Sequence, residues 1–362
     1  MMFDRVEKVR KRMAEHSAEV LLLCPSHDLF YLTGINDRLM ERLSCVVITR
    51  QDIVFVAPVF EIGNISADIR AGITCHGWTD GEDPFAILDG YLPQGEREAL
   101  ICGVAPAWIL LECQRLRSGY HWSNADRIVQ NMRMRKDDTE YKMMKDVQKR
   151  ANNALYMLYE HGIEGLTEIE AGRILMQYCE QEGLEGEIPI VASGPNSALP
   201  HHHCSEKVIA RGDVVVIDYV AADRTNGYQA DTTRTVAVGT MPERLPEIYD
   251  IVMCANQAVF EASKPGVPCE QVDTAARDVI SAAGYGKYFT HRLGHGLGLS
   301  VHEEPYMTQG NKMPIEQGFV YSDEPGIYMP GDFGVRIEDI LFIHDDGAER
   351  LTAADHDLRV IG

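Results

Sequence analysis

Two stretches of this 362-residue chain each carry a pair of carboxylates at nearly the same spacing, and this repeat constrains the fold most strongly. Asp218 ends an apolar stretch, and Asp231 follows 13 positions later across a turn rich in Asp, Asn and Gly. Glu324 also ends an apolar stretch, and Glu338 follows 14 positions later across a Pro-Gly-Asp turn. Apolar runs joined by such turns predict strand hairpins. Two hairpins with matching acids predict two half-domains related by pseudo-symmetry.

Burying these four acids costs free energy, because an isolated carboxylate loses its hydration in apolar surroundings. Considered singly, each is more often a strand-end or salt-bridged acid than a metal ligand. His295 reverses that balance, because it lies between two glycines that allow a close backbone approach and histidine is the commonest metal-binding side chain. The set Asp218, Asp231, His295, Glu324 and Glu338 therefore favours a metal site.

One nitrogen and many carboxylate oxygens form a donor set of defined chemistry. Such a set suits two divalent cations about 3.5–4 Å apart, bridged by carboxylates and a water or hydroxide. Hard oxygen donors favour Mn, Co or Zn over copper or an iron–sulfur cluster. The sequence thus predicts two divalent metal ions per chain.

The length of the chain suggests two domains, with the boundary in a charged stretch at 132–138. Residues 1–131 read as an α/β domain, because an opening helix leads into strands that alternate with helical patterns. Its apolar strands are expected at 20–24, 45–49 and 53–57. We expect a mixed or parallel sheet there, and a second domain over 132–362.

The second domain is predicted to be α+β. Its first helix begins at Thr139 and stops before Gly162, and its second opens with a capping box from Thr167 to Glu170 and stops at Gly183. Further helices are expected at 246–262 and 270–283, and strands at 188–191, 214–219, 232–238, 318–322 and 335–343.

Charge and cysteine usage narrow the classes of partner. The chain has 55 acidic and 34 basic residues, a formal charge of −21, which argues against nucleic-acid binding or a polybasic membrane patch. Its apolar runs are too short to span a membrane and its N-terminus lacks an apolar signal core, so we expect a cytoplasmic protein. The nine cysteines contain no C-x-x-C pair and predict reduced thiols. Cys204 is the possible exception, because it directly follows a run of three histidines.

Six motifs occur in order and resemble the pita-bread metallopeptidases, in the branch of Xaa-Pro dipeptidases (prolidases) and Xaa-Pro aminopeptidases. The motifs lie at 193–201, 212–218, 231–235, 294–303, 324–328 and 334–339. The segment 28–34 is similar to the smaller N-terminal domain of that branch. The resemblance implies a C-terminal pita-bread fold, a creatinase-like α/β N-terminal domain, hydrolysis of the bond before proline in short peptides, and a homodimer.

The resemblance also implies roles for individual residues. Asp218 and Asp231 would hold one metal ion, His295 and Glu324 the other, and Asp231 and Glu338 would bridge the two. Glu324 would also accept the proton of the attacking water. The residues implied beside the substrate are His201, His291, His302 and Arg336. By contrast, His202 and His203 read as structural or incidental, and Tyr228 as a packing residue.

Four features depart from the usual pattern of that branch. Val220 stands where the motif after the first aspartate usually has glycine, and the following loop is longer and contains a further acid, Asp223. Tyr306 stands where prolidases often carry an arginine that holds the C-terminal carboxylate of the substrate. Asp323 stands where an apolar residue usually precedes the Glu-Pro-Gly motif. The missing arginine weakens a strict dipeptidase reading.

Two other functions remain open from the residues. The same fold can act on another small amide, amidine or carbon–heteroatom bond, since fold does not dictate function. A catalytically inactive peptide-binding relative is the third reading. Such a relative would be expected to have lost metal ligands, whereas all five are present here.

Overall fold

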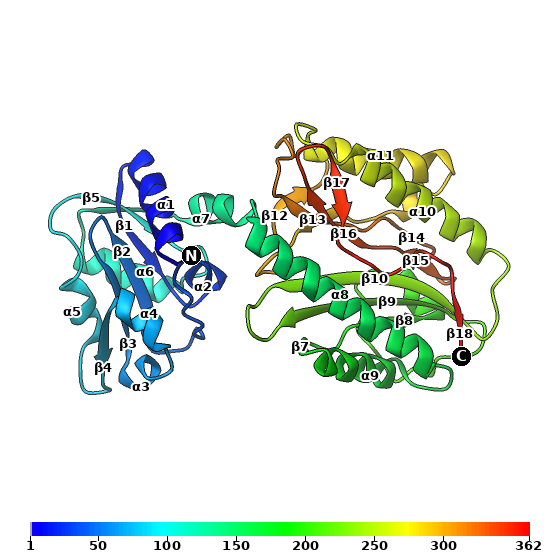
Figure 1. Ribbon diagram of the computed structural model, residues 1–362, viewed down its shortest axis with the longest axis horizontal. Coiled ribbons are helices and arrows are strands. Elements are labelled where there is room, and N and C mark those ends of the chain that lie inside the picture. Colours follow the sequence, from blue (N-terminus) through cyan, green and yellow to red (C-terminus); the bar gives the residue numbers. More distant parts are fainter. Residues whose placement is uncertain (1) are drawn as a thin grey trace. The chain divides into compact units, whose positions relative to one another are not determined.

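The computed structural model describes residues 2–362, and the chain divides into two compact units between Arg133 and Met134 (Figure 1). The N-terminal unit is built on one mixed sheet with the strand order β4-β3-β2-β1-β5-β6. Its strands are β1 (Ala18–Leu23), β2 (Cys45–Thr49), β3 (Ile53–Pro58), β4 (Thr74–Trp78), β5 (Arg97–Ile101) and β6 (Tyr120–Asn124). β1, β2 and β3 pair antiparallel, while β4, β5 and β6 join in parallel, which confirms the expected mixed sheet.

Seven helices of the described chain accompany this sheet. They are α1 (Met2–Glu15), α2 (His27–Thr33), α3 (Val59–Ile62), α4 (Ala67–Gly72), α5 (Pro84–Asp89), α6 (Ala107–Leu116) and α7 (Asp126–Arg133). β2 and β3 are buried at every position, which explains why their sequences read as continuous apolar runs rather than alternating ones.

The C-terminal unit contains two pairs of long helices. α8 (Asp138–His161) opens with a capping box made by Asp137 and Glu140, and α9 (Glu168–Gln181) opens with the predicted box of Thr167 and Glu170. The second pair is α10 (Leu245–Ala262), with a proline in its first turn, and α11 (Cys269–Ala282). Short 3₁₀ helices lie at η1 (Gly194–Ala198) and η2 (Gly286–Tyr288).

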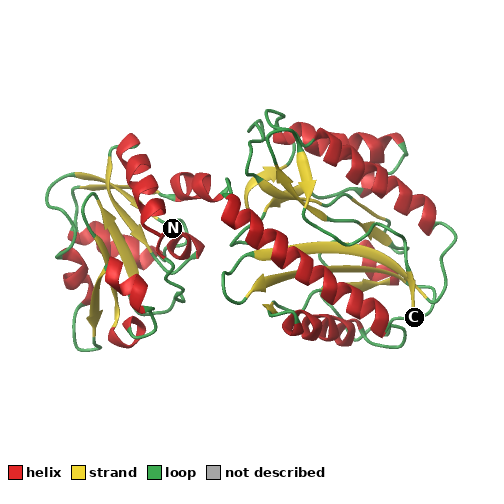
Figure 2. Cartoon of the chain, in the orientation of Figure 1, coloured by secondary structure: helices red, strands yellow, loops and turns green. Residues whose placement is uncertain are grey.

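Two five-stranded sheets and a small hairpin complete the unit (Figure 2). The first sheet combines β7 (Leu184–Glu185), β8 (Ile190–Ser193), β9 (Val214–Asp223), β10 (Gln229–Val238) and β18 (Val360–Ile361). The second combines β11 (Gly294–Gly296), β12 (Glu303–Met307), β13 (Val320–Asp323), β16 (Asp339–Ile343) and β17 (Ala348–Arg350). The hairpin pairs β14 (Gly326–Tyr328) with β15 (Gly334–Arg336).

Each half of the C-terminal unit repeats the same plan. α8 and α9 pack on the first sheet, α10 and α11 pack on the second, and β10 contacts β16 where the two sheets meet. Each half therefore supplies a helix pair followed by strands that carry two acids, which agrees with the predicted half-domains.

Two expected strands differ in the structure. The stretch 335–343 is split, because β15 pairs with β14 whereas β16 pairs with β13. Glu338 lies at the break, and its backbone N–H donates to the carbonyl of Thr233 in the first sheet at 3.0 Å. The strand expected at 188–191 begins only at Ile190, since Pro189 has no N–H to donate to a sheet. Among the described residues, no helix is long and apolar enough to cross a membrane.

Candidate metal centre

The β9–β10 hairpin places both of its acids on one face. Asp218 lies directly opposite Thr233, and Asp231 lies directly opposite Val220. Side chains of opposite residues in an antiparallel pair leave the sheet on the same side, and so do residues two apart on one strand. Asp218, Asp231 and Thr233 therefore share the face that meets the second sheet.

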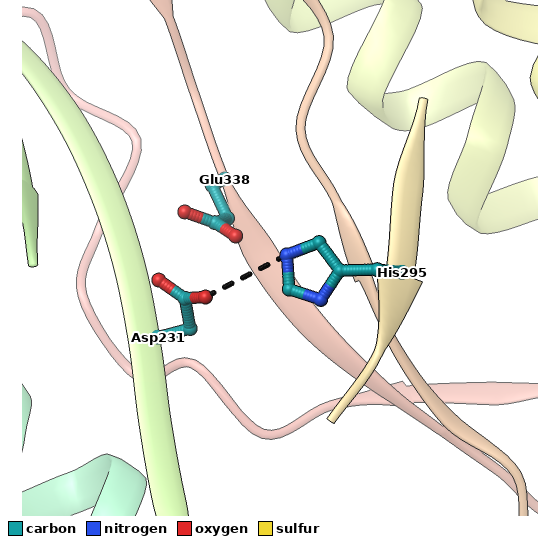
Figure 3. Close-up of side chains that lie close together, drawn as sticks. All are labelled: Asp231, His295 and Glu338. Atoms are coloured by element: carbon teal, nitrogen blue, oxygen red, sulfur yellow. Dashed lines mark ion pairs between the residues drawn. The ribbon is translucent and has the colours of Figure 1, made fainter. Parts of the chain in front are cut away.

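Asp231, His295 and Glu338 converge from three strands or strand ends (Figure 3). One ligand atom of each lies within 4.8 Å of the others, and all three residues are buried. His295 Nε2 is 3.8 Å from Asp231 Oδ2 and 3.4 Å from Glu324 Oε1. Three of the four sequence-predicted acids, Asp231, Glu324 and Glu338, thus meet at the imidazole of His295.

Hydrogen bonds hold these side chains in place. Thr233 Oγ1 donates to Glu338 Oε2 at 2.8 Å, and Ser322 Oγ donates to Glu324 Oε1 at 3.1 Å. His295 Nδ1 lies 3.1 Å from the carbonyl of Gly296, so the ring keeps its Nε2 toward the acids. A second group that fixes the far nitrogen of a histidine is typical of metal-binding imidazoles.

The concentration of buried carboxylates in this cluster favours the binding of a cation. Burial, and then the nearby acids, raise the pKa of Asp231 and of Glu338 well above the usual range. Burial also lowers the pKa of His295 to about 3, so its ring is neutral and Nε2 is free to donate its lone pair to a metal. Several buried carboxylates around one neutral imidazole fit divalent cations, which would remove the repulsion between the acids.

Asp218 stands slightly apart from the three converging residues. It accepts a hydrogen bond and ion pair from Arg336 Nη2. The same guanidinium donates to Thr233 Oγ1 at 3.2 Å, to the carbonyl of Pro200 at 3.1 Å and to Tyr328 Oη at 2.9 Å. Arg336 thereby ties one acid of the cluster to the loop that carries the triple-His run.

The predicted substrate histidines lie around the cluster. The His302 ring is 4.3 Å from the His295 ring between centroids, and the two planes meet at 77°. His291 Nε2 is 2.8 Å from Tyr328 Oη, which is in turn bonded to Arg336. His201 and His302 are exposed, whereas burial lowers the pKa of His291 to about 3 and keeps that ring neutral.

Comparison with known proteins agrees with this geometry. Residues 142–345 match metallopeptidase family M24, and residues 5–135 match the creatinase/prolidase N-terminal domain. The chain belongs to metallopeptidase family M24. This membership and the mixed α/β architecture confirm the predicted family and the predicted fold class, a pita-bread C-terminal fold with a creatinase-like N-terminal domain.

Relatives in this family align over nearly the whole chain. The Xaa-Pro dipeptidase of Pyrococcus furiosus is 40% identical over 360 residues, which is 99% of this chain and 100% of that protein. The probable dipeptidase PepE of Mycobacterium tuberculosis is 35% identical over 345 residues, 94% of this chain and 92% of that one. The crystal structure of recombinant prolidase from Thermococcus sibiricus superimposes with a TM-score of 0.93 at 34% identity, covering 100% and 99% of the two chains.

Sequence reasoning about this M24 site missed two contributors, Tyr328 and Glu168. Tyr328 lies inside the motif at 324–328, so the sequence marked it as a candidate for the contacts that its hydroxyl makes with Arg336 and His291. No sequence feature marked Glu168, because an acid in the first turn of a helix is common. It is fully buried and binds His202, which makes that histidine a structural member of the loop.

The departures from the usual M24 pattern have local explanations in part. Asp223 pairs with Arg150 and accepts from the N–H groups of Thr225 and Asn226, so it builds the longer turn. Asp323 lies opposite Asp339 across β13 and β16 and is fully buried. Within residues 2–362, neither oxygen of the Asp323 carboxyl has a hydrogen-bond partner, and burial raises its pKa well above the usual range.

The remaining singled-out residues are structural. Cys204 Sγ donates to the carbonyl of Pro189 at 2.9 Å and accepts from the N–H of Val191 at 3.2 Å, so it anchors the start of β8. The hydroxyl of Tyr228 donates to Glu140 Oε1. All nine cysteines are free thiols, as expected for this chain.

Proposed function

We propose that this chain is a dinuclear metal-dependent peptidase that hydrolyses the bond before proline in dipeptides or short peptides. The convergence of Asp231, His295 and Glu338 at one buried point carries the proposal, because that donor set fits divalent cations in a metallopeptidase family. The names of the aligned relatives, Xaa-Pro dipeptidase and prolidase, support proline as the residue after the bond that is cut.

We assign two divalent ions, Mn, Co or Zn, to five ligands. Asp218 and Asp231 would hold one ion, His295 and Glu324 the other, and Asp231 and Glu338 would be shared. When bound, such ions supply Lewis acidity at the carbonyl and make water nucleophilic near neutral pH.

The side chains of the protein supply the remaining steps. Glu324, steadied by Ser322, would take the proton from the attacking water at its carboxylate. His302 beside His295 and His201 on its exposed loop would face the scissile bond. There they would stabilise the tetrahedral intermediate and protonate the leaving proline nitrogen, a tertiary amide nitrogen that has no hydrogen of its own. His291 would line the substrate pocket.

Arg336 would act mainly by positioning. Its four hydrogen-bond partners fix Asp218, Tyr328 and the carbonyl just before His201 relative to one another. A displacement of about 1 Å among groups that must act together can cost about 10²-fold in rate. We therefore assign Arg336 to holding the substrate loop against the metal ligands.

We also propose a division of labour between domains. Residues 132–362 form the catalytic domain, and residues 1–131 form an accessory domain through which a cytoplasmic homodimer assembles. Val59 and Phe60 of the N-terminal unit are 54% and 59% exposed, which supports an apolar contact with a partner. Net negative charge supports a small peptide substrate rather than nucleic acid or an anionic membrane.

A substrate panel tests the proposed activity. Xaa-Pro dipeptides, longer peptides with Xaa-Pro at the N-terminus, and non-proline amides are each assayed with Mn, Co and Zn. We expect hydrolysis of the proline substrates only. Turnover of longer peptides above dipeptides would assign the aminopeptidase activity, and turnover of non-proline amides alone would contradict the proposal.

A further inference from the structure

A dipeptide that ends in proline presents a free carboxylate very close to the bond that is cut. An enzyme that prefers such substrates needs a cation at that end, because a carboxylate that leaves water without a partner loses its hydration. In this chain the position after the His-Glu-Glu-Pro segment is Tyr306, which cannot supply the charge. This inference rests on the proposed function and asks which residue supplies it.

Arg336 is not available for that task. It is 2% exposed, and its guanidinium is already engaged by Asp218, Thr233, Tyr328 and the carbonyl of Pro200. Binding a substrate carboxylate there would break the ion pair with Asp218. The cation must come from another residue at the rim of the site.

Arg292 is placed to supply it. It precedes His295 by three residues, is half-buried, and its guanidinium carbon lies 4.4 Å from the centre of the Tyr306 ring. In the part of the chain that the structure describes, no carboxylate pairs with Arg292. A guanidinium that lies over an aromatic ring keeps its N–H edge free for a bidentate contact with a carboxylate.

The sheet register places this pair beside the metal cluster. Tyr306 lies directly opposite His295 in the β11–β12 pair, so the two side chains leave the sheet on the same side. His302 lies against His295 in turn, with 4.3 Å between the centroids of the two rings. A stack of Arg292 on Tyr306 thus stands next to the histidine expected beside the scissile bond.

We propose that Arg292, held on the ring of Tyr306, binds the C-terminal carboxylate of an Xaa-Pro dipeptide and makes the enzyme a dipeptidase. Tyr306 then acts as a positioning residue, because its ring holds the guanidinium of Arg292 in place. A longer peptide or an amidated dipeptide has no carboxylate at this place and leaves Arg292 unpaired.

The test compares an Xaa-Pro dipeptide with the same dipeptide amidated at its C-terminus. In the metal-loaded wild type we expect the acid to be preferred. Arg292→Met should lower kcat/KM for the acid by about 10- to 100-fold, chiefly through KM, and change the amide by less than about threefold, since one charge-assisted contact is lost. Arg244→Met, at an exposed ion pair with Asp332, is the matched control and should leave both substrates unchanged.

Two further variants separate recognition from folding. Tyr306→Leu should also lower kcat/KM for the dipeptide acid, but by less than Arg292→Met. In this variant Arg292 loses the aromatic ring against which it packs and keeps its charge. Placing an arginine at the neighbouring position, as Tyr306→Arg in the Arg292→Met background, should restore part of the preference for the acid.

Each outcome decides between the two proposals. If Arg292→Met lowers kcat/KM equally for the acid and the amide while its metal content stays at the wild-type level, Arg292 does not bind the substrate carboxylate. That result would contradict the inference. A wild type that prefers the amide or a longer peptide also overturns it, although the proposed peptidase function stands. A wild type that cleaves no Xaa-Pro substrate with any metal refutes the proposed function itself.

Discussion

Replacing Glu168 by glutamine tests how the loop before the metal site is held. Oε1 accepts from the N–H and hydroxyl of Ser193, both at 2.8 Å, and from Asn196 Nδ2 at 2.9 Å. Oε2 lies 2.8 Å from His202 Nε2 and accepts from the N–H and hydroxyl of Ser205 at 3.0 and 2.6 Å. One buried carboxylate thus gathers both ends of the loop that contains His201.

The pKa of Glu168 sets the size of the effect. Burial raises this pKa, but the hydrogen bonds from Ser205, Asn196 and His202 outweigh burial and bring it from 4.5 to about 2. That difference corresponds to about 3 kcal/mol in favour of the ionised form in the folded protein. Glu168→Gln places an amide nitrogen where one oxygen accepted three hydrogen bonds, so we expect a loss of about 3 kcal/mol at pH 7.

The sign of the pH dependence follows from the lowered pKa. The contribution of Glu168 is fully present above its unfolded pKa near 4.5 and is lost as the pH falls toward about 2. By about pH 3.5 the wild type has lost about 1.4 kcal/mol of it, so the gap to the variant narrows to about 2 kcal/mol.

Urea unfolding of the metal-free proteins at the two pH values measures the gap. Glu160→Gln, at an exposed position of α8, is the control and should change stability by less than about 0.5 kcal/mol. A loss below about 1 kcal/mol at pH 7, or a gap that does not change with pH, would refute the reasoning.

Three further perturbations probe the remaining claims. Asp231→Asn should abolish hydrolysis with the circular dichroism spectrum unchanged, because it removes the shared carboxylate; wild-type turnover would show that the ligand was misassigned. Asp323→Asn should stabilise the metal-free protein by about 1 kcal/mol at pH 7 and by less toward pH 4. The reason is the raised pKa of this unpartnered acid, which destabilises the folded state only as the pH rises. Equal stability of variant and wild type in denaturant unfolding at both pH values would contradict this. Phe60→Glu should convert a homodimer to monomers in sedimentation, and an unchanged mass would place the interface elsewhere.

Much of the site could be predicted because its signals are local. Asp218 and Asp231 stand out as acids in an apolar hairpin, and the observed register puts them on one face as the alternation of a strand requires. His295 stands out through its flanking glycines. Gly294 has to be a glycine, since a Cβ atom there would lie 1.9 Å from the carbonyl oxygen of Ser322.

The contacts between distant segments could not be predicted in the same way. The break at Glu338 depends on a hydrogen bond to Thr233 in another sheet, and the stretch itself reads as one continuous strand. The pairing of Arg336 with Asp218 joins residues 118 positions apart, and the burial of Glu168 depends on a loop that follows it. Such partners are chosen by tertiary packing, which leaves no periodic pattern in the sequence.

The central claim is that two divalent ions in the cluster of Asp218, Asp231, His295, Glu324 and Glu338 allow this chain to cut before proline. It is tested most directly by titrating Mn²⁺ into the metal-free protein while hydrolysis of an Xaa-Pro dipeptide is followed. We predict no turnover without metal and activity that saturates at about two equivalents per chain, as two metal ions sharing carboxylates require. Hydrolysis that proceeds fully without metal, or none at any Mn²⁺, Co²⁺ or Zn²⁺ concentration, would contradict the account.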